Sequence, residues 1–215
     1  RSEVYERIRN CRIIVGTVAA ISGKPELFRL KHFDVAIIDE ATQILEPQLL
    51  GILCARGEDG KDAIDKFVLI GDHKQLPAVV QQNTEQSAIY DESLLSIGLT
   101  NLKDSLFERL YRNCTATVHR SYDMLCRQGR MHPEVALFAN RAFYGGRLIP
   151  VGLPHQIESS DTICRLAFYP SVPEKVGASA KINYSEARIV ADLAVRIYED
   201  HQADFDESRT LGIIT

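Results

Sequence analysis

The sequence predicts an α/β protein built on a parallel sheet, from two observations. Three short apolar runs, at 12–17, 33–38 and 66–71, do not alternate polar with apolar residues, and such runs are typical of strands covered on both faces. Stretches with helical character lie between them. Strands that alternate with helices favour a parallel sheet with right-handed crossovers.

The helices and loops of the first half follow from caps and polarity. A helix is expected over 47–54, because its proline stands in the first turn, where helices tolerate it. The polar stretch 56–65 predicts a loop, and 81–101 predicts a longer irregular excursion. Ser105 and Glu108 have the spacing of a capping box, so the next helix should begin near residue 105.

The second half contains fewer strand signals. A helix that opens with proline is expected over 133–141, and strand-and-loop material over 165–182. The apolar residues of 185–200 recur at the spacing of a helix with one buried face. The run 211–215 predicts a final strand.

Composition excludes several classes of protein. Hydrophobic residues at 45% and charged residues at 25% fit a globular protein rather than a disordered or fibrous one. The net charge of −4 provides no overall basic field, which argues only weakly against nucleic acid, because a basic groove can lie on an acidic protein. The five scattered cysteines form no C-x-x-C pair and indicate reduced thiols in a cytoplasmic protein. No apolar run is long enough to span a bilayer, so no membrane partner is expected.

Both ends of the sequence lie within expected elements. It begins without Met in a charged, helix-like segment and stops on an apolar run. Chain termini normally lie at the surface rather than in a buried strand. We therefore expect other domains in the same, longer chain.

Two acids follow the run 33–38 directly, as Asp39 and Glu40. Ligands of an open parallel sheet bind beyond the carboxyl ends of its strands. There one acid can hold Mg²⁺ while the other orients or deprotonates a water aimed at a phosphate. The alternative is that Asp39 only caps the following helix and that Glu40 is solvated in its first turn.

The run 66–71 repeats this design. It ends in Gly71, which permits a tight turn, and Asp72, His73, Lys74 and Gln75 follow. We expect these side chains at the same edge as the two acids. A neutral glutamine there can hydrogen bond both a phosphate oxygen and a water.

Together these residues resemble superfamily 1 helicases of the Upf-like branch. The resemblance is carried by "DEATQ", "GDHKQLPAVV", "SLFERL" and "RMHPEVALFANRAFYGGRL", in the family's order. It implies a RecA-like parallel sheet of the P-loop NTPase type, with parts of two RecA-like domains over 1–118 and 119–215. It also implies an ATP-dependent, monomeric motor that moves 5′ to 3′ on single-stranded DNA or RNA, with DNA slightly favoured.

The resemblance assigns roles to single residues. Glu40 is implied to be the catalytic base, Gln75 the phosphate sensor and Arg130 the arginine that reaches the γ-phosphate. Asp39 is implied to bind the Mg²⁺ that accompanies ATP. The resemblance further implies nucleotide contacts by Asp72 and Gln128, and a nucleic-acid contact by Thr17, which could equally be a helix N-cap.

Two departures from the family pattern stand out. The motif G-x-x-x-x-G-K-[ST], whose amides and lysine cradle the phosphates, does not occur. We therefore expect this chain alone to be inactive. Gly129 stands where the family has an aromatic residue that stacks on adenine, so we expect weaker discrimination for adenine unless Tyr122 fills the gap.

Two alternatives belong to other classes. A metal-dependent nuclease would use Asp39, Glu40 and Asp72 around two divalent ions. A degenerate nucleotide-binding scaffold would recruit partners without hydrolysis. Retention of Glu40, Gln75 and Arg130 together argues against the scaffold, which needs none of them.

Overall fold

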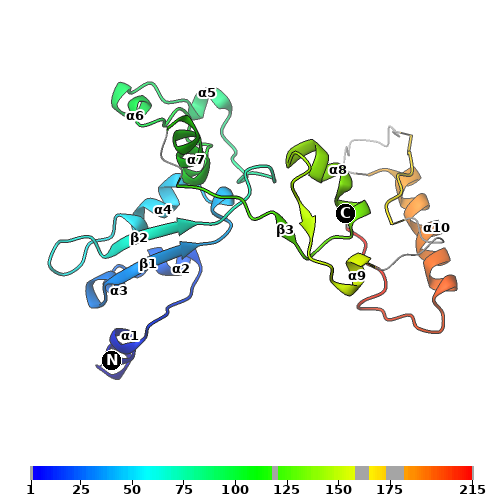
Figure 1. Cartoon of the computed structure of the whole chain (residues 1–215), viewed down its shortest axis with the longest axis horizontal. Coiled ribbons are helices and arrows are strands. Elements are labelled where there is room, and N and C mark those ends of the chain that lie inside the picture. Colours follow the sequence, from blue (N-terminus) through cyan, green and yellow to red (C-terminus); the bar gives the residue numbers. More distant parts are fainter. Residues whose placement is uncertain (1, 118–120, 158–164, 173–181, 215) are drawn as a thin grey trace. The chain divides into compact units, whose positions relative to one another are not determined.

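The computed structural model describes residues 2–117, 121–157, 165–172 and 182–214. They divide into two compact units, Arg1–Leu125 and Cys126–Thr215, which are described separately below. Figure 1 shows the elements in chain order. None of the helices in the described residues combines the length and the apolarity needed to cross a membrane.

The first unit contains two parallel strands and the helices around them. Its elements are α1 (Ser2–Asn10), α2 (Val18–Ser22), α3 (Glu26–Leu30), β1 (Phe33–Ile38), the 3-10 turn η1 (Ala41–Gln43), α4 (Glu46–Leu53), β2 (Ile64–Leu69), α5 (Thr84–Ser87), α6 (Glu92–Ser96) and α7 (Leu106–Ala116). The strands pair in parallel with Phe33 opposite Ile64 and Ile38 opposite Leu69. The parallel α/β class is therefore confirmed.

The core of this unit consists of two buried clusters beside the strand pair. One buried cluster joins Phe28 of α3 and Ile52 of α4 to the start of β2, and a second joins Ile38, Leu49 and Leu106 from β1, α4 and α7. Ser105 caps α7 with the capping box expected from the sequence: its Oγ accepts from the Glu108 amide at 3.2 Å. Helix α4 lies within one residue of its predicted range.

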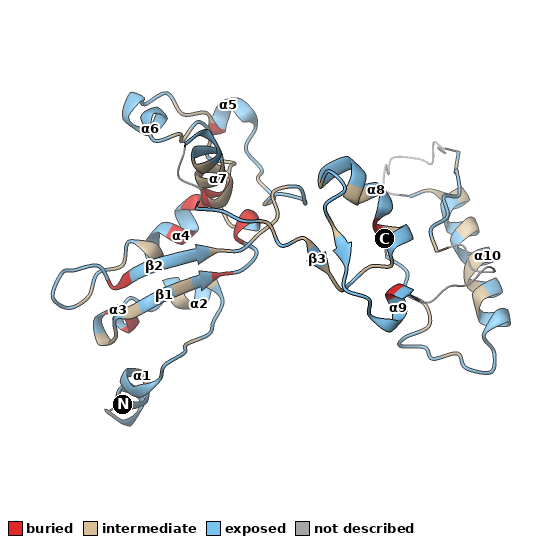
Figure 2. Ribbon diagram, viewed as in Figure 1, coloured by how far each residue is buried: buried red, intermediate tan, exposed pale blue. Residues whose placement is uncertain are grey.

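The expectation of strands covered on both sides is not met. Val35, Ile37 and Val68 lie on one side of the paired strands and are exposed. Phe67 lies on the other side, where it pairs with Ala36, and is exposed as well. Figure 2 shows this exposure along both strands. Among the described residues, packing reaches Ala36 and Ile38, on the opposite side of the pleat from Val35 and Ile37.

The segment 12–17 is not a strand, contrary to the prediction. It is irregular, and Ile13 and Val15 in it are exposed. An apolar run becomes a strand only when a neighbour completes its ladder of hydrogen bonds, and within the described residues only β1 and β2 pair in this unit. The excursion 81–101 is less irregular than expected, because it contains α5 and α6, which Asn83 and Asp91 cap.

The described residues of the second unit form a short parallel pair and three helices. Its elements are β3 (Arg127–Gln128), α8 (Pro133–Phe143), β4 (Ile149–Pro150), α9 (Pro154–Ile157) and α10 (Tyr184–Asp200). The helices predicted over 133–141 and 185–200 are confirmed. The strand predicted over 211–215 is wrong for its described part, 211–214, which is irregular and leaves Ile214 fully exposed. No strand occurs in 165–172 either.

Candidate active site

The two polar loops of the first unit leave the strand pair at the same edge. The ladder continues past the strands: the Ile70 amide donates to the Ile38 carbonyl, and the Ala41 amide donates to the Ile70 carbonyl, both at 2.8 Å. Asp39 and Glu40 lie between these bonds in the segment after β1. Asp72 lies two residues beyond Ile70 in the segment after β2. The shared edge predicted from the sequence is present.

A glycine allows the two loops to approach each other. A Cβ at Gly71 would lie 2.9 Å from Cγ2 and 3.0 Å from the backbone nitrogen of Thr42. Real Cβ atoms essentially never come that close, and a backbone atom cannot move aside cheaply. Any larger residue at position 71 would therefore push the Asp72 loop away from the acids.

Glu40 has an unusual backbone conformation. Its φ of 52° is left-handed, and within the described residues no other residue besides glycine has a positive φ. Such a conformation is rare for residues with a Cβ and is typical of functional positions. The Glu40 carboxylate is exposed and accepts from Gln43 Nε2 at 3.2 Å. The acid is thus held at the edge instead of lying on a helix surface.

Asp39 does not cap the following turn. Its Oδ1 accepts from the Glu40 amide at 2.9 Å, and the N-cap of η1 is Glu40, which makes no capping bond with its side chain. The capping alternative is therefore not what these contacts show. No hydrogen bond within the described residues uses the second oxygen of Asp39.

The Asp72 loop is ordered by its own side chains. Asp72 Oδ1 accepts from the Lys74 amide at 3.0 Å, and Oδ2 accepts from Gln75 Nε2 at 2.9 Å. The Gln75 carboxamide oxygen is thereby turned away from Asp72. This is the atom that could accept a hydrogen bond from a water.

His73 anchors this loop to α7. Its ring stands 4.5 Å from the Tyr111 ring and 6.4 Å from the Phe107 ring, and Tyr122 meets Tyr111 edge to face at 5.1 Å. These separations are those of favourable aromatic pairs. The sequence marked His73 as a polar member of the loop and did not reveal the stack.

The acids suit one magnesium ion better than two. Mg²⁺ in nucleotide sites is held by one or two carboxylates, with waters and phosphate oxygens completing its octahedron, and the second oxygen of Asp39 fits that requirement. In the described part of the chain, no three His, Cys, Asp or Glu side chains gather closely enough to hold a metal ion. The two-metal nuclease alternative needs such a group.

Thr17 is the N-cap of α2. Its Oγ1 accepts from the Ala20 amide at 3.1 Å, so the capping alternative for this residue is confirmed. The hydroxyl proton is still available as a donor. Contact with nucleic acid stays a prediction.

In the second unit, Gln128 and Arg130 share one loop. Gln128 Oε1 accepts from the amides of Arg130 and Met131 at 3.1 and 2.8 Å, and its Nε2 donates to the Met131 carbonyl at 2.8 Å. The Arg130 side chain is exposed, and its guanidinium makes no hydrogen bond or ion pair with any described residue. Gln128 thus orders the loop, and its contact with a nucleotide stays a prediction.

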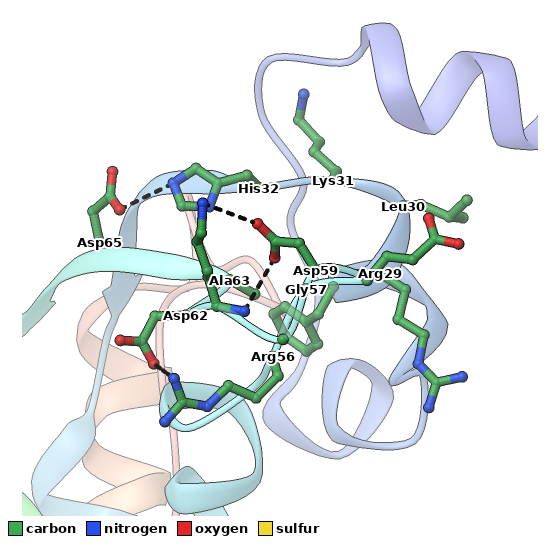
Figure 3. A pocket seen from close by; sticks show the side chains of 14 residues that line it. Arg29, Leu30, Lys31, His32, Arg56, Gly57, Asp59, Asp62, Ala63 and Asp65 are labelled. Carbon is green, nitrogen blue, oxygen red and sulfur yellow. Dashed lines mark hydrogen bonds and ion pairs between the residues drawn. The ribbon is translucent and has the colours of Figure 1, made fainter.

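A separate cavity of about 900 Å³ lies at the opposite edge of the first unit, beside the residues that precede β1 and β2. Figure 3 shows that its charged side chains are largely paired: His32 with Asp65 at 3.0 Å, and Arg56 with Asp62. The residues predicted for catalysis do not line it.

Comparison with known proteins identifies the family. Two family models, each described as "AAA domain", match residues 1–83 and 102–215, and the second match covers more than half of the chain. The chain belongs to the AAA domain family. The relatives of the chain include helicases, and they place it with the Upf-like branch of superfamily 1. This confirms the resemblance seen in the sequence.

Three relatives illustrate the similarity. The chain is 33% identical over 66% of its length to the "DNA replication ATP-dependent helicase/nuclease DNA2" of Gallus gallus and 35% identical over 63% to the "Probable helicase MAGATAMA 3" of Arabidopsis thaliana. It is 30% identical over 94% to a protein named as a probable helicase in Dictyostelium discoideum. The AAA domain chain spans 12%, 14% and 19% of these three proteins, respectively.

Proposed function

We propose that this chain forms part of an ATP-driven motor that moves along single-stranded nucleic acid. The observation that carries the proposal is the shared edge, where Asp39 and Glu40 lie beside the loop of Asp72 and Gln75. Its setting would be two RecA-like domains, with a boundary near residue 118, in a monomeric cytoplasmic protein. The names of the helicase relatives support the class of activity.

Each residue has one task in this proposal. Asp39 would hold Mg²⁺, which neutralises charge on the phosphates of ATP, and Glu40 would take the proton of the attacking water. Gln75 would orient that water through its carboxamide oxygen. Arg130 would stabilise charge that spreads over the γ-phosphate oxygens, for which its planar fork is suited.

Asp72, Gln128 and Thr17 have supporting tasks. Asp72 would hold Gln75 at the nucleotide, and Gln128 would contact the nucleotide from the Arg130 loop. Thr17 would donate its hydroxyl proton to a phosphate of the nucleic-acid strand, a contact that positions the strand without reading its sequence. We also propose that the 215-residue chain alone hydrolyses no ATP, because it lacks the phosphate-binding motif.

The test is ATP hydrolysis by the full-length protein, with and without single-stranded DNA or RNA. We expect hydrolysis to need Mg²⁺ and to be stimulated by the strand. Glu40→Gln should lower kcat at least about 100-fold, roughly the lower end of what a general base contributes, while ATP still binds. Glu58→Gln, an exposed acid in the loop before β2, is the matched control and should match the parent. Hydrolysis that survives Glu40→Gln would refute the proposed mechanism.

A further inference from the structure

A buried glutamine supports the loop that carries Arg130. Gln156 of α9 is 2% exposed, and its carboxamide makes four hydrogen bonds. Oε1 accepts from the amides of Gly152 and Leu153 at 3.1 and 3.2 Å. Nε2 donates to the carbonyls of Gln128 and Met131, both at 3.0 Å. One side chain thus connects the turn after β4 to both ends of the Arg130 loop.

His155 holds the same loop at its centre. Its Nε2 lies 3.0 Å from the Gly129 carbonyl oxygen and 3.2 Å from that of Arg130. Both oxygens can only accept, so the contact requires a proton on Nε2. The Arg130 backbone is therefore bound on two sides: its amide by Gln128 and its carbonyl by His155.

Arg130 combines a backbone held by hydrogen bonds with a side chain that has no partner among the described residues. A loop that only needed stability could engage its arginine in an ion pair, yet this guanidinium has no partner among the described residues. Preorganisation lowers the entropy that a side chain loses when it meets its ligand. We infer that Gln156 and His155 are positioning residues that aim Arg130 at the γ-phosphate, an inference that rests on the proposed function.

The chemistry of Gln156 allows its two halves to be separated. Gln156→Glu keeps an acceptor for Gly152 and Leu153 but loses the donor, and sets a carboxylate against the carbonyls of Gln128 and Met131. Gln156→Leu removes both halves. His155→Ala removes only the central contact and, because His155 is exposed, leaves the packing intact. Gln202→Leu, an exposed glutamine of the same unit, is the matched control.

The experiment measures amide hydrogen exchange and steady-state ATP hydrolysis in the full-length protein. In Gln156→Glu and His155→Ala we expect exchange at Arg130 and Met131 to be at least ten-fold faster than in the parent. In Gln156→Glu the amides of Gly152 and Leu153 should stay protected, whereas Gln156→Leu exposes them as well. We expect kcat to fall about 10- to 100-fold with KM for ATP within two-fold, because misplacement harms the transition state.

Several outcomes would overturn the inference. Unchanged exchange at Arg130 and Met131 in both Gln156→Glu and His155→Ala would show that the hydrogen bonds of Gln156 and His155 do not hold the Arg130 loop. Faster exchange with parental kcat would show that they hold the loop without serving catalysis. If the parent itself hydrolyses no ATP, the proposed function fails instead, and positioning of Arg130 is then decided by exchange alone.

Discussion

Arg109 of α7 hydrogen bonds to both carboxylate oxygens of Glu46, the first residue of α4. Arg109 Nε donates to Glu46 Oε2 at 2.8 Å, and Nη2 donates to Oε1. Nη1 also donates to the Ile97 carbonyl at 3.0 Å. The ion pair is nearly buried, with side chains 11% and 8% exposed. It connects two helices and the excursion between β2 and α7.

Removal of one partner should be costly. Arg109→Met leaves the Glu46 carboxylate buried without compensation, and we expect the free energy of unfolding to fall by about 3–5 kcal/mol. Replacement of both partners, by Glu46→Leu with Arg109→Met, should recover most of the loss. Urea denaturation measures each variant.

The matched control for that pair lies three residues along α7. Arg112 pairs with Asp104 on the surface, and Arg112→Met should cost only about 0–1 kcal/mol. A similar loss in Arg109→Met and Arg112→Met would contradict the role of burial.

Gly71→Ala tests the contact between the Asp72 loop and the segment that carries Asp39 and Glu40. The new Cβ meets the Thr42 backbone, so we expect a loss of about 1–3 kcal/mol in unfolding free energy, the usual cost of overpacking, and a lower kcat for ATP in the full-length protein. Gly51→Ala is the control: Gly51 lies within α4 with nothing near its Cβ position, so alanine should stabilise the helix by about 0.5–1 kcal/mol. Parental kcat in Gly71→Ala would show that the close approach is dispensable.

The His32–Asp65 pair predicts a pH dependence. The hydrogen bond that His32 Nε2 donates to Asp65 raises the pKa of His32 above its usual value. Stability from the pair is therefore fully present below the unfolded pKa, about 6.5, and is lost as pH rises through the folded pKa. The stability difference between the parent and His32→Gln should be greatest in mild acid and should vanish in mild alkali. In an Asp65→Asn background the same comparison should be flat, and a difference that grows with pH would contradict the assignment.

Gly129 predicts weak nucleotide discrimination. A Cβ at this position would lie 3.2 Å from Leu153 Cδ1 and 3.5 Å from Val151 Cγ2, so the loop has little room for a larger residue. Loss of a base–aromatic stack removes about 1–3 kcal/mol of affinity. We expect kcat/KM for ATP and GTP to agree within about ten-fold in the full-length protein. A strong preference for ATP would show that another ring, such as Tyr122, contacts the base.

Local signals in the sequence predicted the longer helices, namely α1, α4, α7, α8 and α10, and the strand pair. The capping box at Ser105, the proline that opens α8 and the apolar periodicity of α10 are all read within one or two turns. The runs 12–17 and 211–215 have the same apolar character as β1, yet neither 12–17 nor 211–214 pairs with another strand among the described residues. Strand formation depends on distant neighbours, which composition does not reveal.

Some contacts of the candidate site could be predicted from the sequence, and others could not. The placement of Asp39, Glu40 and Asp72 at one edge followed from parallel strands ending in acids. The hydrogen bonds of Gln156 and His155 to the Arg130 loop could not be predicted. They join residues 25 to 28 positions apart, and they do so through backbone carbonyls, which leave no mark in the sequence. The same holds for the Glu46–Arg109 pair, 63 positions apart.

The left-handed backbone of Glu40 lowers folding stability at the position whose carboxylate is proposed to act in catalysis. A side chain with a Cβ pays about 1–2 kcal/mol in this region, and glycine would not. Glu40→Gly should therefore yield a chain that resists denaturation better than the parent but that lacks the carboxylate proposed to deprotonate water. A search for thermostable variants would select this substitution, and a search for active ones would eliminate it.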